Sequence, residues 1–331
     1  MRAVVLVGGR GTRLRPLTDH VPKPMLPIGH RPMIAALVER LAHAGVDDVT
    51  LALGFRPEPF MVAFPDGRVG DVTLRYAVEP EPLDTAGAIR FAADHAGIDA
   101  TFVVANGDIV TDLAVADLVA AHRRTGAEAT LHLTPVDDPS AFGVVEVDAD
   151  GRVERFVEKP TPGETSSNLI NAGTYVFEAS MLARIPTGRR VSVERETFPA
   201  VVADGGLFAI ATDDYWTDTG RPDLYLAANA ALLTGERPER CPAVAPGASV
   251  AEDATLERSL VEAGATVAAR ARLVGSVVLD GGFVGEGATV ERSIVMGRVG
   301  AGTTVRDAVI GADGDVADGV TVADARIPEQ G

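Results

Sequence analysis

The sequence predicts an α/β domain with a mostly parallel sheet, followed by a parallel β-helix of six-residue repeats. Over residues 1–235, short apolar runs alternate with segments of helical periodicity, which is typical of a parallel sheet covered by helices on both faces. A polar stretch with two prolines, 236–243, then indicates a linker. From 244 to 327, aliphatic residues recur every six positions within blocks, and stacked coils bury such residues under their neighbours.

The composition is that of a chain of 331 residues, 46% of them hydrophobic, which can form two ordinary domains with real cores. No apolar run approaches the roughly 18 residues of a membrane span, and the N-terminus lacks the layout of a signal peptide. The single cysteine, Cys241, excludes an internal disulfide and fits a reducing compartment. A net charge of −17 argues against nucleic acid or an anionic membrane as a partner. We therefore expect a cytoplasmic protein that binds neither.

The first predicted strand, 3–7, ends in a loop that contains Gly8, Gly9 and Gly11. Glycine lets backbone amides approach a ligand closely, so a glycine loop after a first strand suits a phosphate group. The loop fits neither the dinucleotide fingerprint nor the GxxxxGK[ST] phosphate loop, and a plain tight turn is the alternative. Because the chain is acidic overall, a local excess of positive charge favours an anionic ligand here. The cations of this segment are Arg10, Arg13, Arg15 and Lys23.

Lysine is rare in this chain, since only Lys23 and Lys159 occur among thirty lysine and arginine residues. Each lysine is followed by a proline, in the tripeptides 22–24 and 158–160. A compact ammonium and a planar guanidinium are not interchangeable. The two lysines therefore indicate positions that require an ammonium, and chance survival in a biased composition is the alternative.

Further elements follow from apolar periodicity. Residues 148–151, between two predicted strands, are expected to form a hairpin turn. The predicted strands are 49–53, 72–78, 101–105, 127–135, 141–146 and 153–157, and the predicted helices are 32–44, 85–95, 112–124 and 224–233.

The string at 8–18, GGRGTRLRPLT, followed by VPKP at 21–24, resembles the signature of the sugar-1-phosphate nucleotidyltransferases. Within that family the chain is most similar to the mannose-1-phosphate guanylyltransferases. The resemblance implies a Rossmann-like nucleotidyltransferase domain over 1–235 and a left-handed parallel β-helix of hexapeptide repeats over 244–327. It also implies an enzyme that transfers a nucleoside monophosphate from a triphosphate to a sugar-1-phosphate. GTP and mannose-1-phosphate, which give GDP-mannose and pyrophosphate, are the favoured substrates.

The segment 79–88, EPEPLDTAGA, resembles the part of the family that reads the base, usually written E-x-P-L-G-T-A-G. It follows a predicted strand end, and ligands bind beyond such ends in open α/β sheets. Asp84 stands where the family usually has glycine. We expect Asp84 to cap the helix that follows, and an altered contact with the base or ribose is the alternative.

Two aspartates are the metal ligands that the resemblance implies. Asp108 follows a predicted strand in the tripeptide 106–108, and Asp218 lies in a W-x-D-x-G motif at 216–220. A carboxylate just past a strand end is well placed to hold Mg²⁺, which prefers hard oxygen ligands and phosphates shared with the substrate. Either motif alone would also fit an ordinary turn.

Three segments resemble the family's sugar pocket, namely 141–145, 156–160 and 171–177, and a fourth, 192–203, resembles its S-x-E-x-E-x-F-P helix. In this pocket the resemblance implies that backbone, carboxylate and ammonium groups meet the sugar and its phosphate. The residues are Gly143, where the sugar approaches the backbone, Glu158 for the sugar hydroxyls, Lys159 for the phosphate, and Asn171 near the sugar.

The implied reaction needs no general base, because the attacking phosphate oxygen is already anionic. Catalysis then depends on positioning and on cations. The implied catalytic residues are Arg13, Lys23 and Lys159. The nucleotide-binding residues that the resemblance implies are Leu6, Gly8, Gly9, Gly11, Thr12, Arg13, Lys23, Glu79, Thr85, Ala86 and Gly107.

The C-terminal repeat carries glycines that we expect at matching places in five blocks. No histidine occurs after His132, which argues against a hexapeptide-repeat acyltransferase, so assembly or regulation is the expected role of the β-helix. Exposed β-helix faces favour association, and we expect a homo-oligomer. The glycines are Gly247, Gly264, Gly287, Gly302 and Gly319.

Two alternatives stay open on the sequence alone. The same chemistry could use dTTP, UTP or ATP, or another hexose or cyclitol phosphate. The chain could also be a regulatory subunit that binds a nucleotide sugar without turnover. The presence of every implied chemical residue favours an enzyme over the subunit.

Overall fold

The computed structural model describes residues 1–54 and 57–329 of the protein, which form two compact units. The first unit comprises Met1–Gly9 and Ile34–Trp216, and the second comprises Arg10–Met33 and Thr217–Gly331. The glycine loop is therefore divided after Gly9. The domain limits at 235 and 244 stay a prediction, because compactness alone does not test which segments fold independently.

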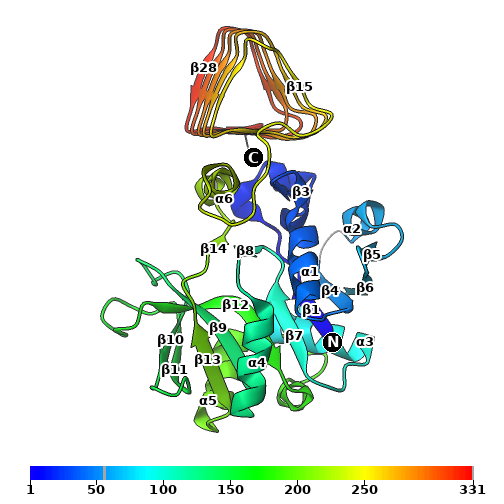
Figure 1. Ribbon diagram of the computed structural model, residues 1–331, viewed down its shortest axis with the longest axis vertical. Coiled ribbons are helices and arrows are strands. Elements are labelled where there is room, and N and C mark those ends of the chain that lie inside the picture. The colour runs from blue at the N-terminus through cyan, green and yellow to red at the C-terminus, as the bar shows by residue number, and fades with distance from the viewer. Residues whose placement is uncertain (55–56, 330–331) are drawn as a thin grey trace. The chain divides into compact units, whose positions relative to one another are not determined.

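A ten-stranded sheet forms the centre of the first unit (Figure 1), in the order β11-β10-β12-β7-β1-β4-β6-β5, with β9 on β12 and β13 on β9. Four neighbouring strands at its centre are parallel: β7 (Phe102–Asn106), β1 (Arg2–Leu6), β4 (Asp48–Leu53) and β6 (Val72–Val78). Strand β12 (Leu169–Phe177) runs antiparallel to β7, so the sheet is mixed. The other strands of this sheet are β5 (Arg68–Val69), β9 (Ala129–Pro135), β10 (Gly143–Val147), β11 (Val153–Glu158) and β13 (Leu207–Ala211), and β8 (Ile109–Thr111) lies outside it.

The predicted helices of the first unit lie close to their expected positions, with two differences, and α2 was not predicted. Helix α4 begins at Val115 rather than at 112, because the backbone amide of Asp112 donates to the carbonyl of Tyr215 at 2.9 Å. The segment expected as one helix at 192–203 is a π-helical turn, Val193–Thr197, followed by α5. The helices are α1 (Met33–His43), α2 (Glu58–Ala63), α3 (Asp84–Ala96), α4 (Val115–Thr125) and α5 (Phe198–Ala203), with a 3-10 turn at Ala179–Arg184.

Aromatic side chains lock the middle of the first unit's core. Tyr175, Phe177, Phe102 and Phe198 are all at most 1% exposed. Their rings meet at 5.3–6.2 Å between centroids, mostly edge to face, and such pairs add about 0.5–1.5 kcal/mol each beyond area burial. The core thereby fixes β7 against β12 at the amino end of β7.

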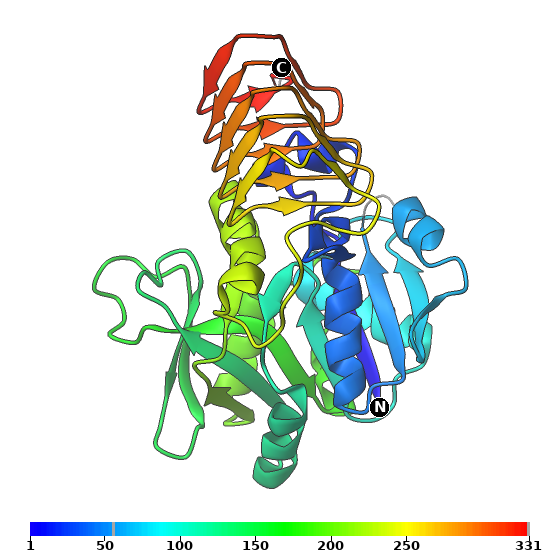
Figure 2. The same ribbon diagram turned by 45° about the horizontal axis from the view of Figure 1, so that its top comes forward.

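The second unit contains the predicted left-handed β-helix, seen end-on as a triangle in Figure 1 and as stacked coils in Figure 2. Three parallel five-stranded sheets form its sides. One consists of β15 (Ser249–Val250), β18 (Thr266–Val267), β21 (Phe283–Val284), β24 (Arg298–Val299) and β27 (Asp315–Val316). Another consists of β16 (Thr255–Glu257), β19 (Arg272–Val274), β22 (Thr289–Glu291), β25 (Thr304–Arg306) and β28 (Thr321–Ala323). The last consists of β17 (Leu260–Val261), β20 (Val277–Val278), β23 (Ile294–Val295), β26 (Val309–Ile310) and β29 (Arg326–Ile327).

The coils do not all have the same length. Ser249 pairs with Thr266, Thr266 with Phe283, Phe283 with Arg298, and Arg298 with Asp315, so successive coils take 17, 17, 15 and 17 residues. Each coil is therefore shorter than three exact six-residue repeats, so the six-residue period is interrupted once in every coil. Aliphatic residues of all five coils, from Val261 to Val316, form one continuous buried cluster.

The five predicted repeat glycines lie at two corners of the β-helix. The amide of Gly264 donates to the carbonyl of Gly247, which places both at one corner. Gly287, Gly302 and Gly319 follow one another at a second corner, with amides bonded to the preceding coil. All five have positive φ, because each corner of the triangle turns through a left-handed residue. Each glycine lies two residues before a strand, so the prediction of matching places in five blocks is confirmed, and these places fall at two corners.

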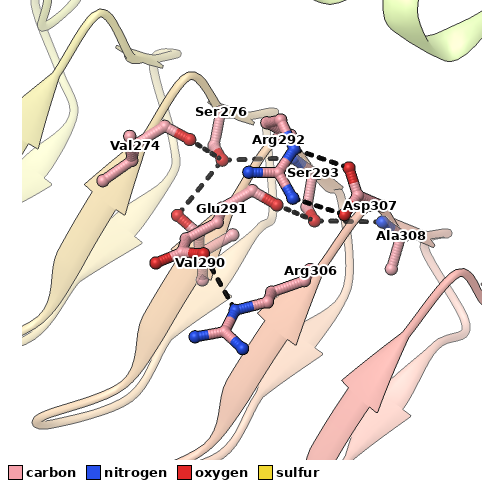
Figure 3. A network of polar contacts seen from close by, with 9 residues as sticks. All are labelled: Val274, Ser276, Val290, Glu291, Arg292, Ser293, Arg306, Asp307 and Ala308. Carbon is pink, nitrogen blue, oxygen red and sulfur yellow. Dashed lines mark hydrogen bonds and ion pairs between the residues drawn. The ribbon is translucent and has the colours of Figure 1, made fainter.

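The third corner is stabilised by a ladder of buried serines (Figure 3). The hydroxyl of Ser276 donates to the carbonyl of Val274 at 2.9 Å and accepts the amide of Ser293 from the next coil at 3.1 Å. Ser293 repeats this pattern with Glu291 and with the amide of Ala308. Each rung satisfies a buried polar group across two coils, which removes the desolvation cost of an unpaired donor. An Arg292–Asp307 ion pair, with contacts of 2.7 and 2.5 Å, spans the same coils on the outside.

The second unit also contains the segment Arg10–Met33 and helix α6 (Pro222–Thr234). The hydroxyl of Tyr225 on α6 donates to the carbonyl of Pro27 at 2.5 Å, and Asn229 accepts the amide of Gly29 at 3.2 Å. The segment has short elements only: 3-10 turns at Thr12–Leu14, Leu17–Asp19 and Lys23–Met25, and strands β2 (Pro27–Ile28) and β3 (Arg31–Pro32); β14 is Trp216–Asp218. No helix within 1–54 and 57–329 is long and apolar enough to cross a bilayer.

Candidate active site

The predicted site residues divide between the two compact units. Those of the first unit surround the carboxyl ends of its central strands and the β10–β11 hairpin. They are Leu6, Gly8, Gly9, Glu79, Thr85, Ala86, Gly107, Asp108, Gly143, Glu158, Lys159 and Asn171. Those of the second unit are Gly11, Thr12, Arg13, Lys23 and Asp218.

In the first unit, the residues after β1, β4 and β6 meet at one edge of the sheet. A side-chain carbon added at Gly8 would lie 3.4 Å from the amide of Gly54 and 3.7 Å from the carboxylate of Glu79. Glu79 accepts the amide of Leu83 at 2.9 Å, and its half-buried position raises the pKa of its carboxyl group. The first half of the glycine loop and the base-reading segment are thus neighbours. Gly54 was not predicted, because a single glycine after a strand carries no distinctive pattern.

Asp108 lies just past β7, which pairs with β1 along its whole length. The amide of Gly107 donates to the carbonyl of Leu6 at 2.8 Å, so this turn is held against the end of β1. The strand order reverses at β1, with β4 on one side and β7 on the other. Ligands of open α/β sheets bind at such a reversal. Asp108 therefore has the position that the sequence predicts for it within its unit.

The backbone at Asp84 explains why the family usually has glycine at this position and why aspartate is tolerated there. Its φ is +62°, in the left-handed region that glycine adopts freely and that aspartate tolerates better than most residues. Its carboxylate accepts the amide of Thr85 at 2.9 Å. Asp84 is thus the first residue of α3, Leu83 occupies the N-cap position without a side-chain cap, and the prediction that Asp84 caps the helix is wrong.

Thr85 belongs to a polar network that sequence reasoning missed. Its hydroxyl donates to Glu194 at 2.7 Å and accepts the amide of Val193 at 2.9 Å, and the hydroxyl of Ser192 donates to the same carboxylate at 2.8 Å. Ala86 is fully buried, with its amide on the carbonyl of Val191. The base-reading segment is therefore anchored on the π-helical turn. The S-x-E-x-E pattern carried the signal for Glu194, but it was assigned only to a helix.

The sugar-pocket residues Gly143 and Glu158 are opposite each other in the β10–β11 hairpin. A side-chain carbon at Gly143 would come within 2.6 Å of the Phe156 ring and 3.0 Å of the Glu158 carboxylate, so glycine is required for this close approach. Burial, and then the charge of Glu194, raise the pKa of Glu158, while Lys159 opposes that shift. The hairpin thus presents a carboxylate whose protonation its neighbours control.

Lys159 is 59% exposed, and its ammonium lies 3.8 Å from the Glu158 carboxylate. Its φ is +52°, an unfavourable value for a residue with a long side chain. Asn171, the fourth sugar-pocket residue, donates from its amide to the hydroxyl of Tyr175 at 2.9 Å and accepts the amide of Gly173 at 3.1 Å. Its side chain is therefore held in a fixed orientation at a break in the β9–β12 register.

In the second unit, Lys23 and Asp218 form an ion pair of 2.9 Å. Lys23 is 5% exposed, and the same Asp218 oxygen also accepts the amide of Gly220 at 2.9 Å. The guanidinium of Arg13 lies 3.6 Å from the other Asp218 oxygen and is 64% exposed. Sequence reasoning assigned these three residues separate roles and did not foresee their contact, because residues 23 and 218 are far apart in the chain.

The loop that carries Arg13 and Lys23 is folded back on itself at Gly11. The hydroxyl of Thr18 donates to the Gly11 carbonyl at 2.9 Å, and Gly11 has a φ of +60°. A side-chain carbon at Gly11 would lie 2.9 Å from the Thr18 methyl and 3.2 Å from Lys23. Glycine at this position therefore permits the compact turn that brings Arg13 and Lys23 to one carboxylate.

The carboxylates present suit a hard divalent cation. Among the residues that the structure describes, no three His, Cys, Asp or Glu side chains are grouped to hold a metal. Mg²⁺ does not need such a cage, because it commonly uses one or two carboxylates together with substrate phosphates and water. The Asp218 oxygen that faces Arg13 lies 3.6 Å from the guanidinium, which is beyond hydrogen-bond distance. This carboxylate oxygen therefore fits a magnesium ligand of this type.

Comparison with known proteins decides the family. Residues 2–235 match the family model described as nucleotidyl transferase. The chain belongs to this family. The nucleotidyl transferase is 42% identical over 279 residues to the mannose-1-phosphate guanylyltransferase of Mycobacterium tuberculosis, a match that covers 84% of this chain and 74% of the relative. The expectations of the family and of an enzyme are thereby confirmed.

Solved structures of the same fold agree with this assignment. A Bacillus anthracis protein assigned as a glucose-1-phosphate thymidylyltransferase, in complex with sucrose, has a TM-score of 0.63 and 26% identity, covering 70% of this chain and 94% of that one. HddC from Yersinia pseudotuberculosis, complexed with GMP-PN, has a TM-score of 0.59 and 28% identity, covering 69% and 97%. The predicted fold class of the nucleotidyl transferase is confirmed, with a sheet that is mixed rather than mostly parallel.

Proposed function

We propose that this nucleotidyl transferase joins GTP and mannose-1-phosphate to give GDP-mannose and pyrophosphate. The observation that carries the choice of substrates is the 42% identity to a mannose-1-phosphate guanylyltransferase over 84% of the chain. The likeness to HddC bound to GMP-PN supports a guanine nucleotide. The likeness to the thymidylyltransferase keeps dTTP with glucose-1-phosphate as the second candidate.

In the proposed reaction, an oxygen of the sugar phosphate attacks the α-phosphorus of the triphosphate. The bond between the α-phosphorus and the bridging oxygen breaks, and that oxygen leaves with pyrophosphate. The attacking oxygen is an anion at neutral pH, so no side chain has to accept a proton. The groups that matter are therefore cations that hold two anions together and stabilise the charge of the transition state.

The loop of the second unit supplies two of these cations. Arg13 is largely exposed and presents a fork of donors to the leaving pyrophosphate. Lys23 is buried on Asp218, so its ammonium is fixed in position before substrate arrives. We assign Gly11 and Thr12 to backbone contacts with the same phosphates, because they precede Arg13 in the tight turn.

The first unit supplies the nucleotide cradle and the sugar pocket. Gly8 and Gly9 follow β1, where their amides can meet the nucleotide, and Leu6 and Gly107 lie beside them, joined by the bond from the Gly107 amide to the Leu6 carbonyl. Glu79, Thr85 and Ala86 belong to the anchored base-reading segment. In the pocket, Glu158 accepts hydrogen bonds from sugar hydroxyls over Gly143, Lys159 binds the sugar phosphate, and Asn171 orients the sugar. These assignments follow from the motifs and their local geometry.

Asp108 and Asp218 are the residues that would hold Mg²⁺ together with the substrate phosphates. When bound, the cation neutralises phosphate charge and aligns the attack. We infer in addition a cytoplasmic location, from the single cysteine, and a homo-oligomer, which light scattering of the full chain would test.

The test is pyrophosphate release with Mg²⁺ in a grid of GTP, dTTP, UTP and ATP against mannose-1-phosphate and glucose-1-phosphate. The proposal expects strong turnover only with GTP and mannose-1-phosphate. Turnover with another pair would overturn the substrates and keep the chemistry. No pyrophosphate release with any substrate pair, together with nucleotide binding in a thermal-shift assay, would favour the regulatory subunit.

Asp108 provides the sharper test of the chemistry. Asp108→Asn is expected to lower turnover by about 10²-fold or more, since one oriented charge in the transition state is commonly worth that much. Asp117→Asn, at an exposed position in the first turn of α4, is the matched control and should leave the rate within about 2-fold. A near-normal rate in folded Asp108→Asn would remove Asp108 from the metal site.

A further inference from the structure

The segment that contains Arg13 and Lys23 is bound to the β-helix at its last two coils. Arg326 in β29 donates a hydrogen bond to the carbonyl of Arg15. His20 lies 2.6 Å from the carboxylate of Asp313, in the corner between β26 and β27. All these residues belong to the second unit. The phosphate-binding loop is thus attached at Arg15 and His20, on either side of its central turn.

Gly311 of the same corner leaves no room for a side chain against the loop. A side-chain carbon at Gly311 would lie 2.7 Å from Cγ and 2.8 Å from Cβ of Pro16. The proline ring is stiff and cannot rotate away, so any larger residue at 311 must displace the loop backbone. The β-helix surface is therefore shaped to receive Pro16, which the signature places three residues after Arg13.

A second attachment holds the far end of the segment at an equivalent corner. His30 contacts the buried carboxylate of Glu262 at 3.0 Å, while its other ring nitrogen donates to the Pro242 carbonyl at 2.7 Å. Glu262 follows β17, and Gly311 follows β26, three coils further along the same sheet. At about 4.8 Å per coil, the two attachments are about 14 Å apart along the β-helix. The segment from Arg15 to His30 thus lies along one corner of the β-helix.

Contacts within the loop transmit this attachment to the phosphate-binding side chains. Asp19, beside His20, forms an ion pair with Arg15 at 3.2 Å. Thr18, beside them, donates to the carbonyl of Gly11, whose turn precedes Arg13 and packs on Lys23. A displacement of Arg15–His20 would therefore change the turn that presents Arg13.

We propose that the last two coils of the β-helix position the triphosphate-binding loop, with Gly311, Asp313 and Arg326 as positioning residues that set the affinity for the nucleotide. The inference rests on the proposed function, because it takes Arg13 and Lys23 to be triphosphate ligands. It gives the β-helix a part in nucleotide binding. That part is not evident from the sequence, because the β-helix is far from the signature and lacks catalytic histidines.

The test is a pair of double variants of the full chain. Asp313→Ala with Arg326→Ala removes one aspartate and one arginine that hold the loop. Asp315→Ala with Arg306→Ala is the control, since these exposed residues pair within the β-helix, with Arg298 and Glu291. The first double variant is expected to raise the KM for the nucleotide roughly 5- to 30-fold, from the usual worth of a charged hydrogen bond and a surface ion pair. The KM for the sugar phosphate and the thermal midpoint should match those of the control.

A larger effect is expected of Gly311→Val, which forces Pro16 to move. It should raise the KM for the nucleotide above that of the double variant. Equal nucleotide KM values in the loop variants and the control, with all proteins folded, would overturn the positioning role. A fall in thermal midpoint that accounts for the whole loss of activity would overturn it equally.

Hydrogen exchange of residues 10–24, without substrate, separates this inference from the proposed function. Exchange should be faster in the loop variants than in wild type, and unchanged in the control. This readout holds even if wild type turns over none of the tested substrate pairs, in which case the proposed function fails and the positioning does not. Unchanged exchange in Gly311→Val would show that the β-helix does not order the loop.

Discussion

The segments around Lys23 and Lys159 share a lysine followed by proline, but they present that lysine in opposite ways. Lys23 is 5% exposed and bound to Asp218 at 2.9 Å. Lys159 is 59% exposed, sits at a φ of +52°, and has its nearest carboxylate, Glu158, at 3.8 Å. One ammonium is part of the folded structure, and the other projects from a strained turn.

This difference shows that the same lysine-proline pattern can place one lysine in a structural ion pair and another where it is open to a ligand. A buried charge must have a partner, because the desolvation of an unpaired one costs several kcal/mol. An exposed charge beside a half-buried carboxylate makes only a weak pair and is available to an anionic ligand. Lys23 should therefore matter for folding and for activity, whereas Lys159 should matter for activity alone.

Lys23→Met is expected to have the largest effect, because it leaves Asp218 without its closest cation. We expect a loss of about 2–4 kcal/mol in the free energy of unfolding, together with loss of most activity. Urea unfolding and pyrophosphate release measure the two effects. Arg221→Met, which breaks an exposed pair with Asp223 in the same unit, is the control and should cost about 0.5 kcal/mol or less. If Lys23→Met were as stable as the control, the buried pair would have no structural role.

Lys159→Met should separate activity from stability. We expect turnover to fall by about 10²- to 10³-fold, as for the loss of one charged contact to a reacting phosphate, with the free energy of unfolding within about 0.5 kcal/mol of wild type. Arg155→Met, four residues earlier on β11 and 46% exposed, is the matched control and should retain the wild-type rate. A strong loss of stability in Lys159→Met would abolish the contrast with Lys23.

Glu194→Gln tests the surroundings of the exposed lysine through pH. The negative charge of Glu194 raises the pKa of Glu158, so its removal lowers that pKa. Glu158 binds sugar hydroxyls as a carboxylate, and kcat/KM for the sugar phosphate should fall as the pH drops through its pKa. The acid limb of the pH profile should therefore move to lower pH in Glu194→Gln. Glu196→Gln, whose partner is the exposed Arg189, should leave the limb where it is.

The smallest effect is expected at Asp84. Asp84→Gly relieves a left-handed backbone but loses the bond to Thr85, so the free energy of unfolding should change by about 1 kcal/mol or less. Asp84→Ala keeps the strain without the bond and should be the less stable variant. The ratio of GTP to dTTP turnover should stay the same in both. A changed ratio would make Asp84 a contact for the base.

The sequence predicted the parallel strands β1, β4, β6 and β7 and most helices because their periodicity is local, but it did not predict β12 or β13. The position of Asp108 after β7 was predicted because a strand end determines it, and its role as a metal ligand stays a prediction. The Lys23–Asp218 pair could not be predicted, since nothing local relates residues 195 positions apart. Glu194 was missed for a similar reason: its partner Thr85 lies on another helix, and a π-helical turn has no sequence period of its own. The repeat glycines were found from their spacing, but the spacing does not say which of three corners each one turns.

The short third coil of the β-helix bears on how such a chain can change length during evolution. Its corner between β23 and β24 holds two residues, Met296 and Gly297, where the coils on either side hold four. The strands before and after that corner nevertheless stay in register, and the serine ladder at another corner runs from Ser276 to Ser293 without interruption. Insertions and deletions at this one corner are thus absorbed within a single coil, so the stack can diverge in length there while its hydrophobic interior is inherited unchanged.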